Sequence, residues 1–164
     1  MIGSDTFKVV MRIHAAPVVL ISVRLKDRPH FMTATSFVPV SLNPPLALFC
    51  VNRTNDTHHL IELANIVGIS LLSRGQESIS RRFSTKGPER HQVDDLAIVS
   101  GPCGAPLVST AGATMELRLT QRYEAGDHSI FVGVITSANA RSEASPLLYY
   151  SGEYVSVMQY DPLR

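Results

Sequence analysis

The chain has 164 residues, of which 45% are hydrophobic and 18% are charged, and its formal net charge is +1. This length predicts one domain, spanning residues 1–164, with a core of its own. The nearly neutral charge, without a basic run that carries interleaved aromatic residues, argues against nucleic acid or an anionic membrane as a partner.

The N-terminal quarter predicts a helix followed by a buried strand. An amphipathic helix is expected over residues 6–16, with Phe7, Val10, Met11 and His14 on one face. The apolar patch at residues 15–23 is far shorter than the roughly 20 residues that a membrane-spanning helix needs. We therefore expect a strand over residues 18–25 and no membrane segment.

The two cysteines indicate the compartment. Cys50 and Cys103 are the only cysteines, and they have no C-x-x-C spacing. A chain of this kind is expected to be cytoplasmic and free of disulfides. Cys50 lies in an apolar run and is expected to be a small buried hydrophobic residue.

The next block combines a polar strand with an apolar one. A strand is expected over residues 31–40, paired with the first strand across a turn at residues 26–29. It is crowded with small hydroxyl side chains, which bring donors close to a ligand without bulk. After a turn at residues 43–45, the run at residues 46–51 is apolar throughout and is expected to be buried on both faces.

The second half predicts two short helices, then a hairpin. Asn55 or Asp56 is expected to cap a helix that ends near Asn65, and residues 73–76 fit a capping box that opens a helix through Phe83. Strands are expected over residues 46–52, 66–72, 113–123, 129–135, 147–150 and 154–157, and an irregular segment over residues 85–110.

Residues 113–123 alternate between apolar and polar side chains. Met115, Leu117 and Leu119 are expected to point inward, and Glu116, Arg118 and Thr120 outward. Many short strands with few short helices predict a mainly β chain that closes into a β-barrel.

Three polar groups are candidates for a site. The hydroxyl-rich strand suits a ligand with a polar edge, but threonine is also common in strands that bind nothing. Arg82 and Lys86 belong to a basic cluster that either binds phosphate or is solvated. His128 follows Gly126 and Asp127 at the start of a strand, where Asp127 could orient its imidazole, although a solvated turn explains the same residues.

The order of the motifs resembles that of the flavin reductase-like family. The matching pieces are Thr-Ala-Thr-Ser at residues 33–36, Val-Ser-Leu-Asn-Pro-Pro-Leu at 40–46, Cys-Val-Asn at 50–52, Arg-Phe at 82–83, Gly-Asp-His at 126–128 and a Pro-Leu tail from 146. Thr35 stands where asparagine is common in the family. The resemblance implies short-chain NAD(P)H:flavin oxidoreductase activity on an FMN-binding split barrel, an antiparallel Greek-key fold.

The resemblance also implies a set of binding residues. FMN or FAD would be bound by Thr33, Ala34, Thr35, Ser36, Ser41, Cys50, Val51, Asn52, Thr57, Arg82, Phe83, Lys86 and Tyr154. His128 would serve reduction by NADH or NADPH, and no metal is expected. Phe83 fits a place beside the flavin or, with Ile79, a place in the core.

Partners and alternatives follow from the same resemblance. The family implies a homodimer, and reduced flavin would pass to a flavin-dependent monooxygenase or to oxygen. The first alternative is a split-barrel FMN-binding electron carrier or sensor that nicotinamide does not reduce. A haem- or pyridoxal-related split-barrel protein is the second, and the motifs at residues 41–46 and 126–128 disfavour it.

Overall fold

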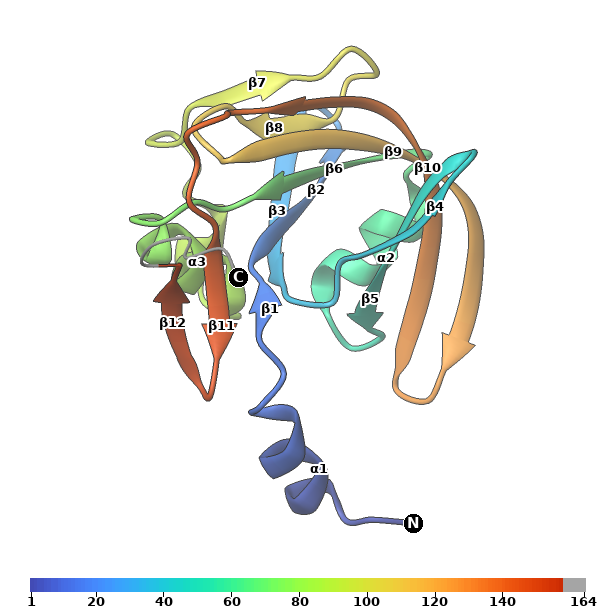
Figure 1. Cartoon of the computed structure of the whole chain (residues 1–164). Coiled ribbons are helices and arrows are strands. Elements are labelled where there is room, and N and C mark those ends of the chain that lie inside the picture. The colour runs from blue at the N-terminus through green and yellow to red at the C-terminus, as the bar shows by residue number, and fades with distance from the viewer. Residues whose placement is uncertain (158–164) are drawn as a thin grey trace.

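The computed structural model describes residues 1–157 and is built mainly from antiparallel strands (Figure 1). The helices are α1 (Ser4–Met11), α2 (Asp56–Leu63), α3 (Glu77–Ser84) and the 3-10 helix η1 (Pro88–His91). The strands are β1 (Ala16–Pro17), β2 (Val19–Leu25), β3 (Arg28–Ala34), β4 (Val38–Leu42), β5 (Pro45–Asn52), β6 (Ile66–Leu71), β7 (Ile98–Ser100), β8 (Pro106–Val108), β9 (Ala113–Ala125), β10 (His128–Ala140), β11 (Leu147–Tyr150) and β12 (Glu153–Ser156). Across residues 1–157, no helix is both long and apolar enough to cross a bilayer.

Seven strands form one curved sheet in the order β3-β2-β6-β9-β10-β5-β4, and every neighbouring pair is antiparallel. Two smaller sheets complete the fold, one of β1, β11 and β12 and one of β7 and β8. The mainly β class expected from the sequence is confirmed. The core inside the curved sheet is made of side chains such as Ile21, Phe49, Ile69 and Phe131.

The expected single strand over residues 31–40 is wrong. It is two strands, β3 and β4, which lie at opposite edges of the seven-stranded sheet although only residues 35–37 separate them. β3 pairs with β2, whereas β4 forms a hairpin with β5. Because the chain must cross from one edge to the other, it leaves strand geometry at this point, and we call residues 35–37 the crossover.

The expectation that residues 46–51 are buried on both faces is also wrong. β5 alternates: Ala47, Phe49 and Val51 are buried, but Leu48 and Cys50 are only half-buried. The face of β5 that carries Leu48 and Cys50 is only partly covered by other elements of residues 1–157. Burial still raises the pKa of the Cys50 thiol above its usual value.

Glu116 does not point outward into solvent, as its place in the alternation predicted. It is fully buried, and its carboxylate accepts hydrogen bonds from the backbone N–H groups of Cys103 and Ala105 and from the Ser137 hydroxyl. Burial favours a raised pKa, but these hydrogen bonds outweigh it and hold the pKa of Glu116 below its usual value. A loop that the sequence assigned to an irregular segment thus covers the outer face of β9.

Several element boundaries differ from the expected ones. The first helix ends at Met11 instead of residue 16, and none of its residues is buried. α3 begins at Glu77, later than the capping box at residues 73–76 predicted. Of the two hydrogen bonds of that box, only the one from the Ser73 N–H to the Gln76 side chain forms. The expected irregular segment contains η1, β7 and β8. Asn55 caps α2 as predicted, accepting from the Thr57 N–H.

Candidate flavin-binding site

The Ser36 hydroxyl joins the crossover to β5. Its Oγ donates to the carbonyl oxygen of Cys50 at 2.9 Å and accepts from the Cys50 N–H at 3.0 Å. One side chain therefore satisfies both backbone groups of a residue on β5, and it continues the β4–β5 pairing beyond the start of β4. This places Ser36 and Cys50, two residues predicted to bind flavin, in direct contact.

A pocket of about 220 Å³ opens beside the crossover, between β3, α3 and the hairpin of β11 and β12. Its lining residues are Val18, Thr33, Ala34, Thr35, Ser80, Ser84, Tyr149 and Tyr154. We call this the crossover pocket. Four of the predicted binding residues, Thr33, Ala34, Thr35 and Tyr154, meet here.

The walls of the crossover pocket are held by side-chain hydrogen bonds. Thr33 Oγ1 donates to the Ser80 carbonyl at 2.7 Å, and the hydroxyls of Tyr154 and Ser80 lie 2.9 Å apart. The rings of Tyr149 and Tyr154 meet edge to face with their centroids 5.3 Å apart. The pocket thus combines aromatic surface with short hydroxyl groups, as a flat aromatic ligand with a polar edge requires.

The backbone of the crossover supplies further donors. Thr35 and Ser36 lie outside β3 and β4, and within residues 1–157 their N–H groups donate no hydrogen bond. The carbonyl and N1 groups on a flavin edge need such donors. The crossover residues therefore fit a flavin, because they present free N–H groups without bulky side chains in front of them.

A second polar group lies where β5 ends and β10 begins. Asn52 is the ladder partner of His128, and its Nδ2 lies 3.5 Å from Asp127 Oδ2. His128 Nδ1 lies 2.7 Å from Asp127 Oδ1. The hydrogen bond from His128, together with its charge, lowers the pKa of Asp127. Asp127 thus orients the imidazole as expected, and Nε2 of the half-exposed ring has no hydrogen-bond partner within residues 1–157.

The other predicted residues near β5 are less available. The Val51 side chain is in the core, so only its backbone can reach a ligand. Thr57 is buried, and its Oγ1 accepts from the guanidinium of buried Arg90 at 2.8 Å. Ser41 pairs with Leu46 near the tip of the β4–β5 hairpin, and five residues of extended chain, roughly 16 Å, separate it from Ser36.

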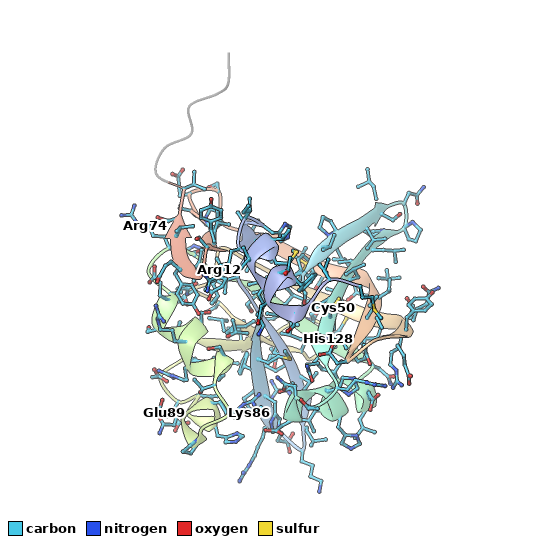
Figure 2. All side chains as sticks on the ribbon, turned by 90° about the horizontal axis from the view of Figure 1, so that it is seen from below. Arg12, Cys50, Arg74, Lys86, Glu89 and His128 are labelled. Carbon is cyan, nitrogen blue, oxygen red and sulfur yellow. The ribbon has the colours of Figure 1, made fainter. Side chains whose placement is uncertain are left out.

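The structure does not bring Arg82, Phe83 and Lys86 to the crossover pocket. Arg82 makes a two-pronged ion pair with Asp95, at 2.5 and 2.7 Å, which raises the pKa of the guanidinium. Phe83 is buried in a second core, a separate cluster that also contains Leu20 and Phe31, and its ring centroid lies 5.3 Å from that of Phe31. Figure 2 shows Lys86 beside Glu89, apart from Cys50 and His128.

Sequence reasoning missed part of the pocket wall. Ser80, Ser84 and Tyr149 line the crossover pocket, and the Arg81 guanidinium lies 4.7 Å from the centre of the Tyr154 ring. The spacing of Ser80 and Ser84, four residues apart on a helix, places them on one face and was the available signal. Tyr149 matches the family's tail motif from residue 146, but its place in the pocket wall depends on the β11–β12 hairpin packing beside β1.

Comparison with known proteins agrees with this geometry. Residues 11–158 match the flavin reductase like domain. The NADH-dependent FAD reductase of Streptomyces globisporus is 36% identical over 131 residues, 78% of this chain and 72% of that protein. The reductase component of 4-hydroxyphenylacetate 3-monooxygenase from Thermus thermophilus is 31% identical over 150 residues, 92% of this chain and 94% of that one.

Solved structures share the fold. The Streptomyces globisporus NADH:FAD oxidoreductase in complex with NAD and FAD fragments superposes with a TM-score of 0.87 at 30% identity, covering 97% of this chain and 93% of that chain. The split barrel expected from the sequence motifs is thereby confirmed.

Proposed function

Because the chain belongs to the flavin reductase-like family, we propose that it is an oxidoreductase that uses NADH or NADPH to reduce FMN or FAD. The observation that supports this activity most directly is the crossover, where free backbone N–H groups and short side chains border a pocket walled by tyrosines. NADH is the proposed donor, since it appears in the names of the relatives.

The protein groups have separate tasks in this proposal. A bound flavin would supply the redox chemistry, accepting a hydride at N5 from C4 of the nicotinamide. The N–H groups of Thr35 and Ser36 bind the polar edge of the flavin, and the tyrosine-lined pocket covers its apolar part. His128, held by Asp127 through Nδ1, presents Nε2 to the nicotinamide nucleotide. No strong acid or base is required, so the protein acts mainly by positioning two flat rings.

We propose that reduced flavin leaves for a partner monooxygenase in the cytoplasm. The Thermus thermophilus relative is named as the reductase component of such a two-component enzyme. A half-open pocket on the surface, instead of an enclosed cavity, suits a flavin that is released after reduction.

We also propose a homodimer, which the exposed apolar residues support. Of the sixteen large apolar side chains that are exposed within residues 1–157, ten lie in the N-terminal segment or on β4. They are Met1, Ile2, Phe7, Val9, Val10, Met11, Ile13, Val38, Val40 and Leu42. Figure 1 shows α1 projecting from the body of the molecule. If two copies are related by a two-fold axis, each copy can cover the apolar residues of the other's N-terminal segment and β4.

The activity is tested with purified protein under anaerobic conditions. NADH is added to protein with excess FMN, and bleaching of the flavin absorbance is followed, with NADPH and FAD in parallel reactions. We expect catalytic bleaching that depends on the protein. Tight FMN binding without reduction by either nucleotide would instead indicate an electron carrier or sensor. A haem or pyridoxal spectrum would exclude both the reductase and the FMN-binding carrier or sensor.

A further inference from the structure

A second cavity, of about 400 Å³, adjoins the crossover pocket. It lies between α1 and the β11–β12 hairpin and is lined by Phe7, Lys8, Met11, Arg12, His14, Ala16, Thr35, Tyr149, Ser151 and Gly152. Thr35 and Tyr149 line both spaces. A ligand that extends out of the crossover pocket therefore enters this cavity, which we call the α1 cavity.

The side chains around the α1 cavity favour an anion. Lys8, Arg12 and His14 line it, whereas no aspartate or glutamate does. Lys8 lies 3.8 Å from Asp5, but both side chains are largely exposed, so this pair is weak and readily exchanged. Within residues 1–157, the Arg12 guanidinium makes no ion pair or hydrogen bond, and Arg12 directly follows the last residue of α1 (labelled in Figure 2).

The C-terminal end of α1 repels an anion less than a helix end with unsatisfied carbonyl groups would. The carbonyl oxygens of Lys8, Val10 and Met11 accept from N–H groups that follow in the chain, and that of Arg12 accepts from the Ser151 N–H at 2.9 Å. The last hydrogen bond also fixes the end of α1 against the β11–β12 hairpin. Because these carbonyls are satisfied, the partial negative charge at the helix end is reduced.

We propose that the α1 cavity binds the diphosphate of the nicotinamide dinucleotide, with Arg12 as its main ligand and Lys8 as the second. This inference rests on the proposed function. If the nicotinamide stacks on a flavin in the crossover pocket, the diphosphate must lie beyond the edge of that pocket. The adjoining α1 cavity offers a guanidinium for bidentate phosphate binding and the ring of Tyr149 for the remaining nucleoside.

The test compares two reductants that differ in the diphosphate. NADH carries it, and 1-benzyl-1,4-dihydronicotinamide does not. In Arg12→Gln protein we expect the ratio of kcat/KM with NADH to kcat/KM with the benzyl compound to fall about tenfold, mainly through KM for NADH, as expected for loss of one charge-assisted contact. Arg12→Lys should retain part of the ratio, and Lys8→Gln should lower it less than Arg12→Gln does.

Arg74→Gln is the matched control, because Arg74 is an exposed arginine outside both cavities. Pyrophosphate should compete with NADH in the wild-type protein and much less in Arg12→Gln. An unchanged ratio in Arg12→Gln overturns the assignment while NADH:flavin activity continues, so the proposed function stands. If neither reductant bleaches the flavin in wild-type protein, the proposed function and this inference fall together.

Discussion

At the scale of single residues, Ser36 connects the fold to the site. Its hydroxyl satisfies the N–H and the carbonyl of Cys50, and the N–H of Ser36 itself faces no protein acceptor within residues 1–157. The sequence singled out Ser36 as a small residue for close approach to a flavin. The structure adds a separate role, in which the residue attaches the crossover to β5.

Replacing Ser36 separates these roles. Ser36→Ala leaves two half-buried backbone groups of Cys50 without their partner, so we expect the free energy of unfolding to fall by about 1–3 kcal/mol. Ser36→Leu should also weaken FMN binding at least tenfold, about 1.4 kcal/mol, because its bulk blocks the ring. Urea unfolding and FMN titration measure the two effects. Ser78→Ala and Ser78→Leu are the controls, because Ser78 is exposed on α3. Wild-type FMN affinity in folded Ser36→Leu protein would place the flavin elsewhere.

His128 is expected to act on the nicotinamide nucleotide more than on the flavin. Its Nδ1 is held by Asp127, and its Nε2 has no hydrogen-bond partner in the part of the chain that the structure describes. Loss of one hydrogen bond from Nε2 corresponds to roughly 0.5–1.5 kcal/mol. His128→Ala should therefore raise KM for NADH or slow reduction severalfold in anaerobic stopped-flow experiments, with little change in FMN affinity.

His59→Ala serves as the control for His128→Ala, because His59 is an exposed histidine on α2. The assignment is wrong if the His128→Ala protein loses flavin affinity but, once saturated with flavin, is reduced at the wild-type rate. His128 would then contact the flavin.

At the scale of elements, Glu116 attaches the loop before β8 to β9. Its carboxylate accepts from Cys103 N–H at 2.9 Å, Ala105 N–H at 2.9 Å and the Ser137 hydroxyl at 2.8 Å. Gly101 lies so close to the carboxylate that a Cβ at this position would collide with it. The alternation along residues 113–123 predicted the strand correctly, but it could not reveal that a distant loop buries a polar position.

Glu116→Gln tests this attachment. The amide keeps the shape but brings an NH₂ group toward backbone donors, so at neutral pH we expect a loss of about 2 kcal/mol in the free energy of unfolding. The folded-state pKa of Glu116 is lowered, so its carboxylate stabilises the fold above the unfolded pKa of about 4.3 and loses this effect as pH falls through the folded pKa. Urea unfolding at a series of pH values should show the difference between wild type and variant shrinking in that acidic range. A difference that stays constant through this range would contradict the role.

At the scale of the whole molecule, the open question is what covers the apolar N-terminal segment and β4. Leu42 is 91% exposed in the single chain, so replacing it with lysine should not disturb the fold of that chain. We expect Leu42→Lys, alone or with Val9→Lys, to shift the protein from dimer to monomer in sedimentation at micromolar concentration. Leu63→Lys is the control, since Leu63 is exposed on α2. A wild-type protein that sediments as a fully active monomer would refute the dimer.

Local sequence patterns determined much of this protein. The alternation and turn residues predicted the β9–β10 hairpin, Asn55 predicted the start of α2, and the ordered motifs predicted the family and its split barrel. These features depend on residues close together in the chain, where propensity, capping and side-chain periodicity act directly.

Only the tertiary structure decided the features that depend on distant segments. It broke the expected strand at residues 35–37, because β3 and β4 find their partners at opposite edges of one sheet. It buried Glu116 under the loop at residues 101–105, committed Arg82 to Asp95 and moved Phe83 into the second core. In each case the outcome depends on a partner from another segment of the chain. Burial and hydrogen bonding are set by the neighbours that folding brings into contact, and local periodicity does not encode those neighbours.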